Sequence, residues 1–243
     1  MRYAAVLALL AGSAAALPNV LPIRSRPFHH SSPNRKDNKF PEYSSNWAGA
    51  VQIGNGYNYV EGTITVPQVS GSSDSAASAW VGIDGDTCQT AILQTGVSFY
   101  GDGSFDAWYE WIPDYSHSFT NFDFSVGDQI KMTVDATSKT TGVASLENLT
   151  TGQKVSHTFS STPSTLCETN AEWIVEDFES GGSLVPFANF GTVTFTNAVA
   201  KGSSGTISPA GSTIIDIRDP NSQQVLTDCG VSGGDVTCRY TGN

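Results

Sequence analysis

Short apolar runs, with almost no helical periodicity between them, restrict this chain to one structural class. β-Branched and aromatic residues recur in segments such as 50–53, 79–83, 107–112 and 129–136, and Gly, Ser, Asn or Asp separate them. Short strands spaced about ten residues apart are typical of β-sandwiches and barrels. Because such domains often reach about 200 residues undivided, we expect residues 44–243 to form a single all-β domain.

The first 17 residues have the pattern of a secretory signal peptide. Arg2 precedes an apolar run over residues 4–16 that ends in three alanines. A run of about 13 apolar residues is too short to cross a bilayer, and no later run is longer. We therefore expect a secreted, extracellular protein that has no membrane span.

Charge divides the remaining sequence in two. Up to Lys39 the chain has six basic residues and one acidic residue, whereas residues 40–243 have 6 basic and 22 acidic residues, a net charge of −16. The pattern predicts a basic propeptide over residues 18–43, which binds the acidic domain at neutral pH and leaves when carboxylates are protonated. The alternative is a disordered tail without a role. The acidic domain argues against nucleic-acid binding and suits a protein that works in acid.

Four cysteines predict two disulfides in a secreted chain. Cys229 and Cys238 flank a glycine-rich turn, which favours a local hairpin bridge and leaves Cys88 to pair with Cys167. There is no CxxC pair, so we expect neither a structural zinc nor another metal. The single Asn-x-Thr sequon, at Asn148, predicts a surface glycan.

Residues 170–179 (NAEWIVEDFE) hold four carboxylates in a segment that otherwise resembles a buried strand. Alternation places Glu172, Ile174, Glu176 and Phe178 on one face. A carboxyl group among apolar neighbours is expensive to ionise, so its pKa rises, and groups of this kind act as acids or bases near or below neutral pH. The alternative is a half-solvated strand with its charges pointing outward.

Several common catalytic chemistries are excluded by missing residues. His117 and His157 are the only histidines after the propeptide, and both lie beside Ser or Thr in turn-like or exposed contexts. No GxSxG or HExxH motif is present. The pair of Asp-Thr-Gly motifs found in pepsin-like enzymes is also absent, which predicts insensitivity to pepstatin. Catalysis would therefore rest on carboxylates, amides and aromatic rings.

Three further segments concentrate such groups. The segment WVGIDGD places Trp80 and Asp84 on one strand face, AWYEW places Trp108 and Glu110 together, and AILQTG ends an apolar run on Gln94. On an aromatic-lined sheet face these side chains could form a cleft for an extended polymer. The residues alone leave three functions open: a glycoside hydrolase that uses Glu110 and Glu176, a peptidase in which one carboxylate activates water, and a non-catalytic carbohydrate-binding module.

These segments, together with SNWAGA and LENLTTGQKVS, resemble the glutamic peptidases, the eqolisin or G1 family of fungal acid endopeptidases. The resemblance extends from Ser45 to the C-terminal cysteine hairpin. It implies a sandwich of two seven-stranded antiparallel sheets, of the concanavalin-like jelly-roll kind, with a concave face for extended polypeptide substrates. It also implies that no cofactor is needed and that the prosegment is an inhibitor. We expect a monomer.

The resemblance further implies a catalytic dyad. Gln94 stands at the family's glutamine position, and Glu176, rather than Glu172 or Glu179, at its glutamate position. The glutamate would take a proton from water and the glutamine amide would stabilise the oxyanion. Residues expected to bind substrate or support the dyad are Trp80, Asp84, Trp108, Glu110 and Phe178. Some family members carry an extra cysteine pair after the EDFE segment, where this chain has SGGS.

Overall fold

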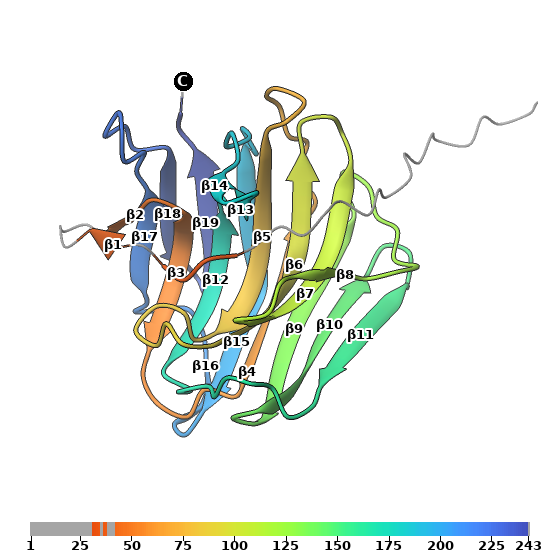
Figure 1. The fold of residues 1–243 in the computed structure, drawn as a ribbon, viewed down its shortest axis with the longest axis vertical. Coiled ribbons are helices and arrows are strands. Elements are labelled where there is room, and N and C mark those ends of the chain that lie inside the picture. Colours follow the sequence, from red (N-terminus) through yellow and green to blue (C-terminus); the bar gives the residue numbers. More distant parts are fainter. Residues whose placement is uncertain (1–30, 35, 38–41, 243) are drawn as a thin grey trace, which may run out of the picture.

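The computed structural model describes residues 31–34, 36–37 and 42–242, and none of them is in a helix (Figure 1). Two large sheets stack face to face, so the predicted all-β sandwich is confirmed. The predicted signal peptide and most of the predicted propeptide lie outside the described residues.

The first sheet carries the predicted site segments. Its pairings are antiparallel except that of β2 with β17, which is parallel. In spatial order its nine strands are β1 (Lys36–Asp37), β2 (Glu42–Ser44), β17 (Thr213–Ile217), β3 (Trp47–Ile53), β12 (Asn170–Glu176), β5 (Ala76–Ile83), β6 (Ile92–Tyr100), β7 (Phe105–Ile112) and β8 (His117–Ser118).

The second sheet has eight strands and closes the sandwich. Its order is β11 (Lys154–Phe159), β10 (Thr141–Asn148), β9 (Gln129–Ser138), β4 (Tyr59–Thr65), β15 (Thr192–Gly202), β19 (Asp235–Tyr240) and β18 (Thr227–Ser232), with β16 (Gly205–Ile207) paired to β15. A two-stranded hairpin, β13 (Glu179–Ser180) and β14 (Ser183–Leu184), follows β12. The sheets exceed the expected seven strands because short strands such as β1, β8 and β16 extend them.

Alternation along the strands produces two apolar layers. The main core lies between the sheets, where Trp173 is fully buried and its Nε1 donates to the Glu61 carbonyl, 2.9 Å away on β4. A second layer covers the other face of the first sheet and contains Trp47, Val51, Trp80, Ile92, Trp108, Ile112, Ile174 and Ile215. With both faces covered, every residue of β5, β6 and β12 is buried. The alternative of a half-solvated strand over residues 170–176 is therefore wrong.

Both predicted disulfides are confirmed. Cys88–Cys167 joins the loop after β5 to the segment before β12 and closes 79 residues of sequence. Cys229–Cys238 joins the neighbouring strands β18 and β19. The Cys88–Cys167 bridge therefore connects the loop after β5 to the segment that leads into β12.

The predicted surface glycan at Asn148 is not supported. The side chain is fully buried at the end of β10. Its Nδ2 donates to the Asp128 carboxylate at 2.9 Å and to the Asp123 carbonyl at 3.2 Å, while its Oδ1 accepts from two backbone N–H groups of the following turn. A glycan on this nitrogen would displace those bonds, because the amide serves as an internal turn cap.

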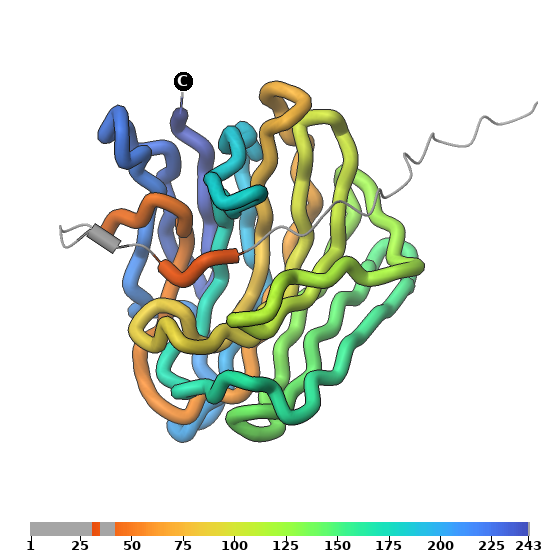
Figure 2. The backbone as a smooth tube through the Cα atoms, in the orientation of Figure 1, coloured from red at the N-terminus to blue at the C-terminus, as the bar shows by residue number. Residues whose placement is uncertain are grey.

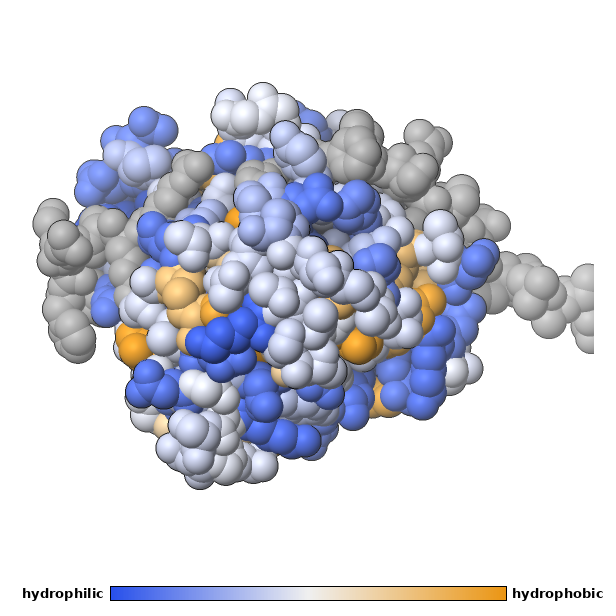
Figure 3. Space-filling model, turned by 60° about the horizontal axis from the view of Figure 1, so that its bottom comes forward, coloured by the Kyte–Doolittle hydropathy of each residue, from blue (hydrophilic) through white to orange (hydrophobic). Residues whose placement is uncertain are grey.

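Exposed apolar side chains are scattered. Figure 3 shows isolated apolar residues among hydrophilic ones on the face that it presents. The large exposed ones are Ile53, Tyr115, Val126 and Leu149, which lie on separate elements. Within residues 31–34, 36–37 and 42–242, there is no helix with the length and apolarity needed to span a membrane.

Candidate active site

Strand register brings the predicted site residues onto one face of the first sheet. Cross-strand partners on β12, β5, β6 and β7 form three rows, and alternation points all three to the same side. The rows are Glu172, Gly82, Gln94 and Glu110; then Ile174, Trp80, Gly96 and Trp108; then Glu176, Ser78, Ser98 and Asp106. Gln94 and Glu176 therefore share a face, with the Trp80 row between them.

Two glycines make room for the indole of Trp80. A Cβ on Gly96 would lie 2.5 Å from the Cβ of Trp80 and 2.4 Å from the Ala79 carbonyl oxygen. A Cβ on Gly82 would lie 2.8 Å from Cζ3 of the same indole. The ring thus leans over Gly82, which would not be possible with a larger residue at either position.

Glu176 is fully buried and held by four donors. Trp80 Nε1 donates to its Oε2 at 2.8 Å, and the Ser31 hydroxyl donates to the same oxygen. The Ser32 backbone N–H donates to Oε1 at 3.2 Å, and Asn46 Nδ2 lies 3.5 Å from Oε1. The pKa of Glu176 is raised to about 7, mainly by burial and also by the nearby Glu110 charge, while the hydrogen bonds from Ser31, Ser32 and Trp80 oppose the rise.

The described part of the predicted propeptide covers Glu176. Figure 2 shows residues 31–34 crossing the strands of the first sheet. Ser31, Ser32 and Asn34 are at most 5% exposed, and Asn46 Nδ2 donates to the Ser32 carbonyl at 3.1 Å. The sequence predicted such a contact from opposite charges, but the groups that meet Glu176 are uncharged. The distribution of charge along the sequence could not predict these uncharged hydrogen-bond donors.

Gln94 and Glu110 form a buried pair. They are direct cross-strand partners, and Gln94 Nε2 donates to Glu110 Oε2 at 2.7 Å. Gln94 Oε1 is buried and has no hydrogen-bond partner among residues 31–34, 36–37 and 42–242. The pair fixes where the amide N–H₂ of Gln94 lies on the shared face, so Glu110 is a positioning residue for Gln94.

Trp47 and Asn46 belong to the site although neither was singled out from sequence. Trp47 is the cross-strand partner of Glu176 on β3, and its ring meets Trp80 edge to face at a centroid distance of 4.8 Å. Asn46 precedes it and reaches Glu176. The available signal was the SNWAGA segment itself, which contributed to the resemblance.

Phe178 lies on the expected face, whereas the Asp84 carboxylate is occupied by backbone groups. Phe178 follows the end of β12 and packs with Ala76 and Tyr100, at a centroid distance of 6.2 Å from Tyr100. Ala76 and Tyr100 are cross-strand partners in the row after Ser78 and Ser98, so Phe178 continues the shared face. The Asp84 carboxylate accepts four backbone N–H bonds, at 2.7–3.2 Å, from residues 167–170. Asp84 therefore anchors that segment. Among the described residues, Asp84, Cys88 and Cys167 are close enough together to hold a metal ion. The two cysteine sulfurs are bonded to each other in a disulfide, however, so they are not thiolate ligands.

Two further acids on or directly after β12 are buried without full hydrogen bonding. Neither oxygen of Glu172 has a hydrogen-bond partner within the part of the chain that the structure describes, and the same holds for Asp177 Oδ1. Burial, followed by the charges of Asp84 and Asp86, raises the pKa of Glu172 well above its ordinary value. Burial, then Glu176 and Asp219, raises the pKa of Asp177 to about 8.

These raised pKa values predict that the fold is stabilised by acid. When the folded-state pKa of an acid exceeds its unfolded value, the folded chain binds more protons, so stability falls as pH rises above the unfolded value, here 4.5 for Glu172. Between pH 4 and 8 the wild type should lose unfolding free energy. Glu172→Gln should make that loss smaller, by about 1.4 kcal/mol for each unit by which folding raises the pKa of Glu172. Thermal unfolding across that range would measure it, with the exposed Asp135→Asn as the matched control. An unchanged pH slope would contradict the prediction.

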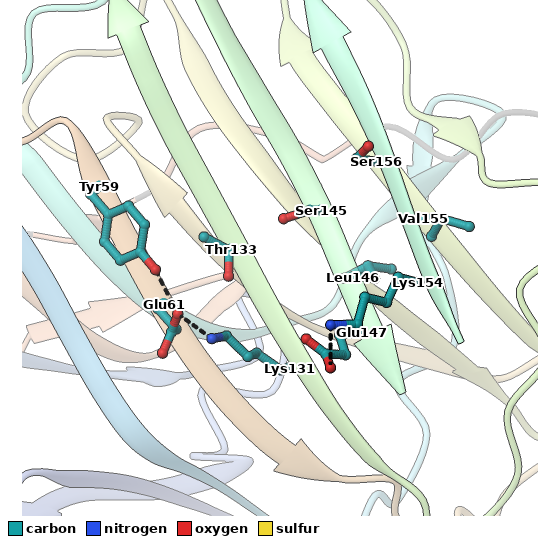
Figure 4. Close-up of a pocket in the computed structure, with 10 residues that line it drawn as sticks. All are labelled: Tyr59, Glu61, Lys131, Thr133, Ser145, Leu146, Glu147, Lys154, Val155 and Ser156. Atoms are coloured by element: carbon teal, nitrogen blue, oxygen red, sulfur yellow. Dashed lines mark hydrogen bonds and ion pairs between the residues drawn. The ribbon is translucent and has the colours of Figure 1, made fainter. Parts of the chain in front are cut away.

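A separate pocket of about 350 Å³ lies on the outer face of the second sheet, as Figure 4 shows. Lys131 pairs with Glu61 at 2.7 Å and Lys154 with Glu147 at 2.8 Å. Burial and the Glu61 carboxylate, which accepts the Tyr59 hydroxyl at 2.5 Å, raise the pKa of Tyr59 to about 12. The charged side chains that line the pocket form these two ion pairs, so their charges balance. The pocket contains none of the predicted site residues.

Comparison with known proteins places this site in a family. Aspergillopepsin-2 of Aspergillus niger is 58% identical over 223 residues, covering 82% of this chain and 78% of that protein. Scytalidopepsin B of Scytalidium lignicola is 52% identical over 219 residues, covering 86% and 84%. A crystal structure of scytalido-glutamic peptidase with a transition state analog inhibitor matches with a TM-score of 0.78 and 50% identity, over 81% of this chain and 98% of that one.

A structure of SCP-B, described as a member of the eqolisin family in complex with the tripeptide Ala-Ile-His, matches with a TM-score of 0.74 and 49% identity, over 81% of this chain and 98% of that one. These similarities confirm the resemblance to glutamic peptidases. The sequence model of the Peptidase A4 family matches residues 45–240, and the chain belongs to that family.

Proposed function

We propose that this chain is the secreted precursor of an acid endopeptidase in which Glu176 is the general base and Gln94 the oxyanion donor. The observation that carries the proposal is the shared face: both side chains are buried on the covered face of the first sheet, and Trp80 donates to Glu176. The relatives' structures with a transition state analog and with a tripeptide support an extended polypeptide as substrate.

The reaction follows from these groups. Ionised Glu176 takes a proton from a water molecule, and the water oxygen attacks the scissile carbonyl carbon. The amide N–H₂ of Gln94 donates to the developing oxyanion, and a neutral amide keeps this ability in acid because it does not titrate. Protonated Glu176 then transfers the proton to the leaving nitrogen as the C–N bond breaks.

The closed site suggests how the precursor stays inactive. Ser31 and Ser32 donate hydrogen bonds to the Glu176 carboxylate, and burial is the main cause that raises its pKa to about 7. In acid the covered carboxyl group would therefore be protonated and unable to act as a base. Departure of the segment would admit water and remove much of the burial that raises the pKa. The prosegment would thus block the site and suppress its base.

The two non-peptidase alternatives are less well supported. A glycoside hydrolase using Glu110 and Glu176 needs both carboxyl groups to act on one glycosidic bond. Glu110 instead accepts from Gln94 at 2.7 Å, and the Trp80 row separates it from Glu176. A carbohydrate-binding module would present exposed aromatic rings, whereas Trp80 and Trp108 are fully buried here.

Acid digestion of haemoglobin tests the proposal directly. The full chain, processed in acid, should release peptides that mass spectrometry can identify, and pepstatin should not prevent their release, because the Asp-Thr-Gly pair is absent. Complete inhibition by pepstatin, or sugar release from xylan without proteolysis, would contradict it.

A synthetic prosegment peptide tests the inhibitory role. A peptide of residues 18–43 should inhibit the processed enzyme more strongly at pH 6 than at pH 3, because protonation of the domain's carboxylates removes the attraction to its basic residues. Added salt should weaken the inhibition at pH 6. The inhibition constant measures both effects, and equal inhibition at the two pH values would contradict the role of charge.

A further inference from the structure

The loop after β5 binds the prosegment at a second point, away from Glu176. The Asn34 backbone N–H donates to the Gly85 carbonyl at 3.1 Å, and Gln89 Nε2 donates to the Asn34 carbonyl at 3.0 Å. The Asn34 side chain donates to Asp86 Oδ1 at 2.6 Å. Asn34 is 1% exposed and Asp86 4% exposed, so this contact is enclosed.

This loop is braced independently of the prosegment. Asp84 at its start holds residues 167–170, Asn170 Oδ1 accepts the Thr87 N–H at 2.9 Å, and Cys88 is joined to Cys167. A site held by such contacts is already shaped before its ligand arrives.

Gly85 brings the loop into contact with the face of the first sheet that carries Glu176 and Gln94. Its φ is +114°, and a Cβ there would lie 2.4 Å from Ile92 Cδ1 and 2.8 Å from Trp47 Cη2. The backbone of Gly85 therefore packs directly on the ring beside Glu176, and its carbonyl can accept from a chain lying across the face.

We propose that the loop over residues 85–89 is a substrate subsite, in which Gly85 and Gln89 bind the main chain of one substrate residue and Asp86 selects a hydrogen-bond-donating side chain there. This inference rests on the proposed function. It assigns Asn34 as the prosegment residue that occupies the subsite before activation.

The chemistry distinguishes two kinds of recognition. The Gly85 carbonyl and the Gln89 amide contact the backbone N–H and C=O that every residue except proline carries, so they hold an extended chain with little dependence on its side chains. The Asp86 carboxyl accepts from the Asn34 side chain in an enclosed place, and an apolar side chain there would lose that hydrogen bond. One continuous stretch of chain reaches both points, because Ser31 and Ser32 donate to Glu176 and Asn34, two residues after Ser32, donates to Asp86.

Cleavage of matched peptides tests the selection. The acid-processed enzyme is given a host peptide with a single scissile bond, in which Asn or the isosteric Leu occupies each position in turn. We expect kcat/KM to be about tenfold higher for Asn than for Leu at one position near the cut bond, mostly through KM. Asp86→Ala should bring the ratio near one, and Asp86→Asn, which keeps an acceptor oxygen, should retain the preference. Asp135→Asn, an exposed acid elsewhere, should leave it unchanged.

Binding of the prosegment peptide provides a readout that needs no turnover. The peptide of residues 18–43 with Asn34→Leu should bind the processed wild type about tenfold more weakly than the unaltered peptide, and bind Asp86→Ala with less than a twofold difference. The Asn34→Leu and Asp86→Ala changes form a double-mutant cycle. If their effects on peptide binding are coupled but cleavage shows no substrate preference, the proposal is overturned and the loop is an anchor for the prosegment only. Cleavage with no preference and no coupling would also overturn it. Absence of all acid proteolysis would instead refute the proposed function.

Discussion

Glu176→Gln is expected to reduce peptide hydrolysis in acid by a factor of about 10²–10⁴ or more while the domain stays folded. The amide has no basic oxygen able to take a proton from water, so the first step loses its base. Its side chain keeps the size of glutamate and an oxygen that can accept from Trp80 Nε1, which now lies 2.8 Å from the carboxylate. Initial rates on haemoglobin at acid pH, with thermal unfolding in parallel, measure both halves of the prediction.

Glu172→Gln is the matched control for this experiment. Glu172 is also a fully buried glutamate on β12, on the same face, and outside the proposed machinery. The same substitution there should leave proteolysis close to that of the wild type at acid pH, where the carboxyl is protonated in any case. Wild-type activity in Glu176→Gln, or equal loss in both variants, would refute the assignment of Glu176 as the base.

Gln94→Ala should lower kcat by a factor of about 10²–10³ with little change in KM. The amide is proposed to donate to the oxyanion, which exists only in the transition state and the intermediate, so its loss should not weaken binding of the intact peptide. Gln94→Glu should also be impaired wherever the new carboxyl is ionised, since an ionised carboxylate has no N–H or O–H to donate.

Separate determination of kcat and KM decides between two roles for Gln94. A rise in KM alone would make Gln94 a substrate-binding residue and would leave the oxyanion without an assigned donor. A fall in kcat for Gln94→Ala, with an unchanged unfolding temperature, would support the dyad. Because Gln94 is buried against Glu110, the unfolding measurement is needed to exclude a structural cause.

The fold was largely predictable because its signals are local. Alternation and turn residues predicted the strands, and the short spacing of Cys229 and Cys238 predicted a hairpin bridge that left Cys88 for Cys167. The dyad was reached differently. Alternation placed Glu172 and Glu176 on one face but could not choose between them, and the resemblance made that choice.

The misses share a physical cause, which is that burial depends on what packs from elsewhere. Asn148 looked like a surface sequon but caps an internal turn, and Asp84 looked like a cleft residue but holds backbone N–H groups of a segment more than 80 residues away. Neither of these outcomes is encoded in the spacing of neighbouring residues.

The sequence by itself determined the class of fold and the alternation that puts Glu172 and Glu176 on one strand face, because each depends on residue identity and local spacing. Only the tertiary structure decided that β12 lies between β3 and β5, that Gly82 and Gly96 admit the Trp80 ring, and that Ser31 and Ser32 cover Glu176. These depend on long-range strand pairing and on uncharged hydrogen bonds, which leave no periodic trace in a sequence.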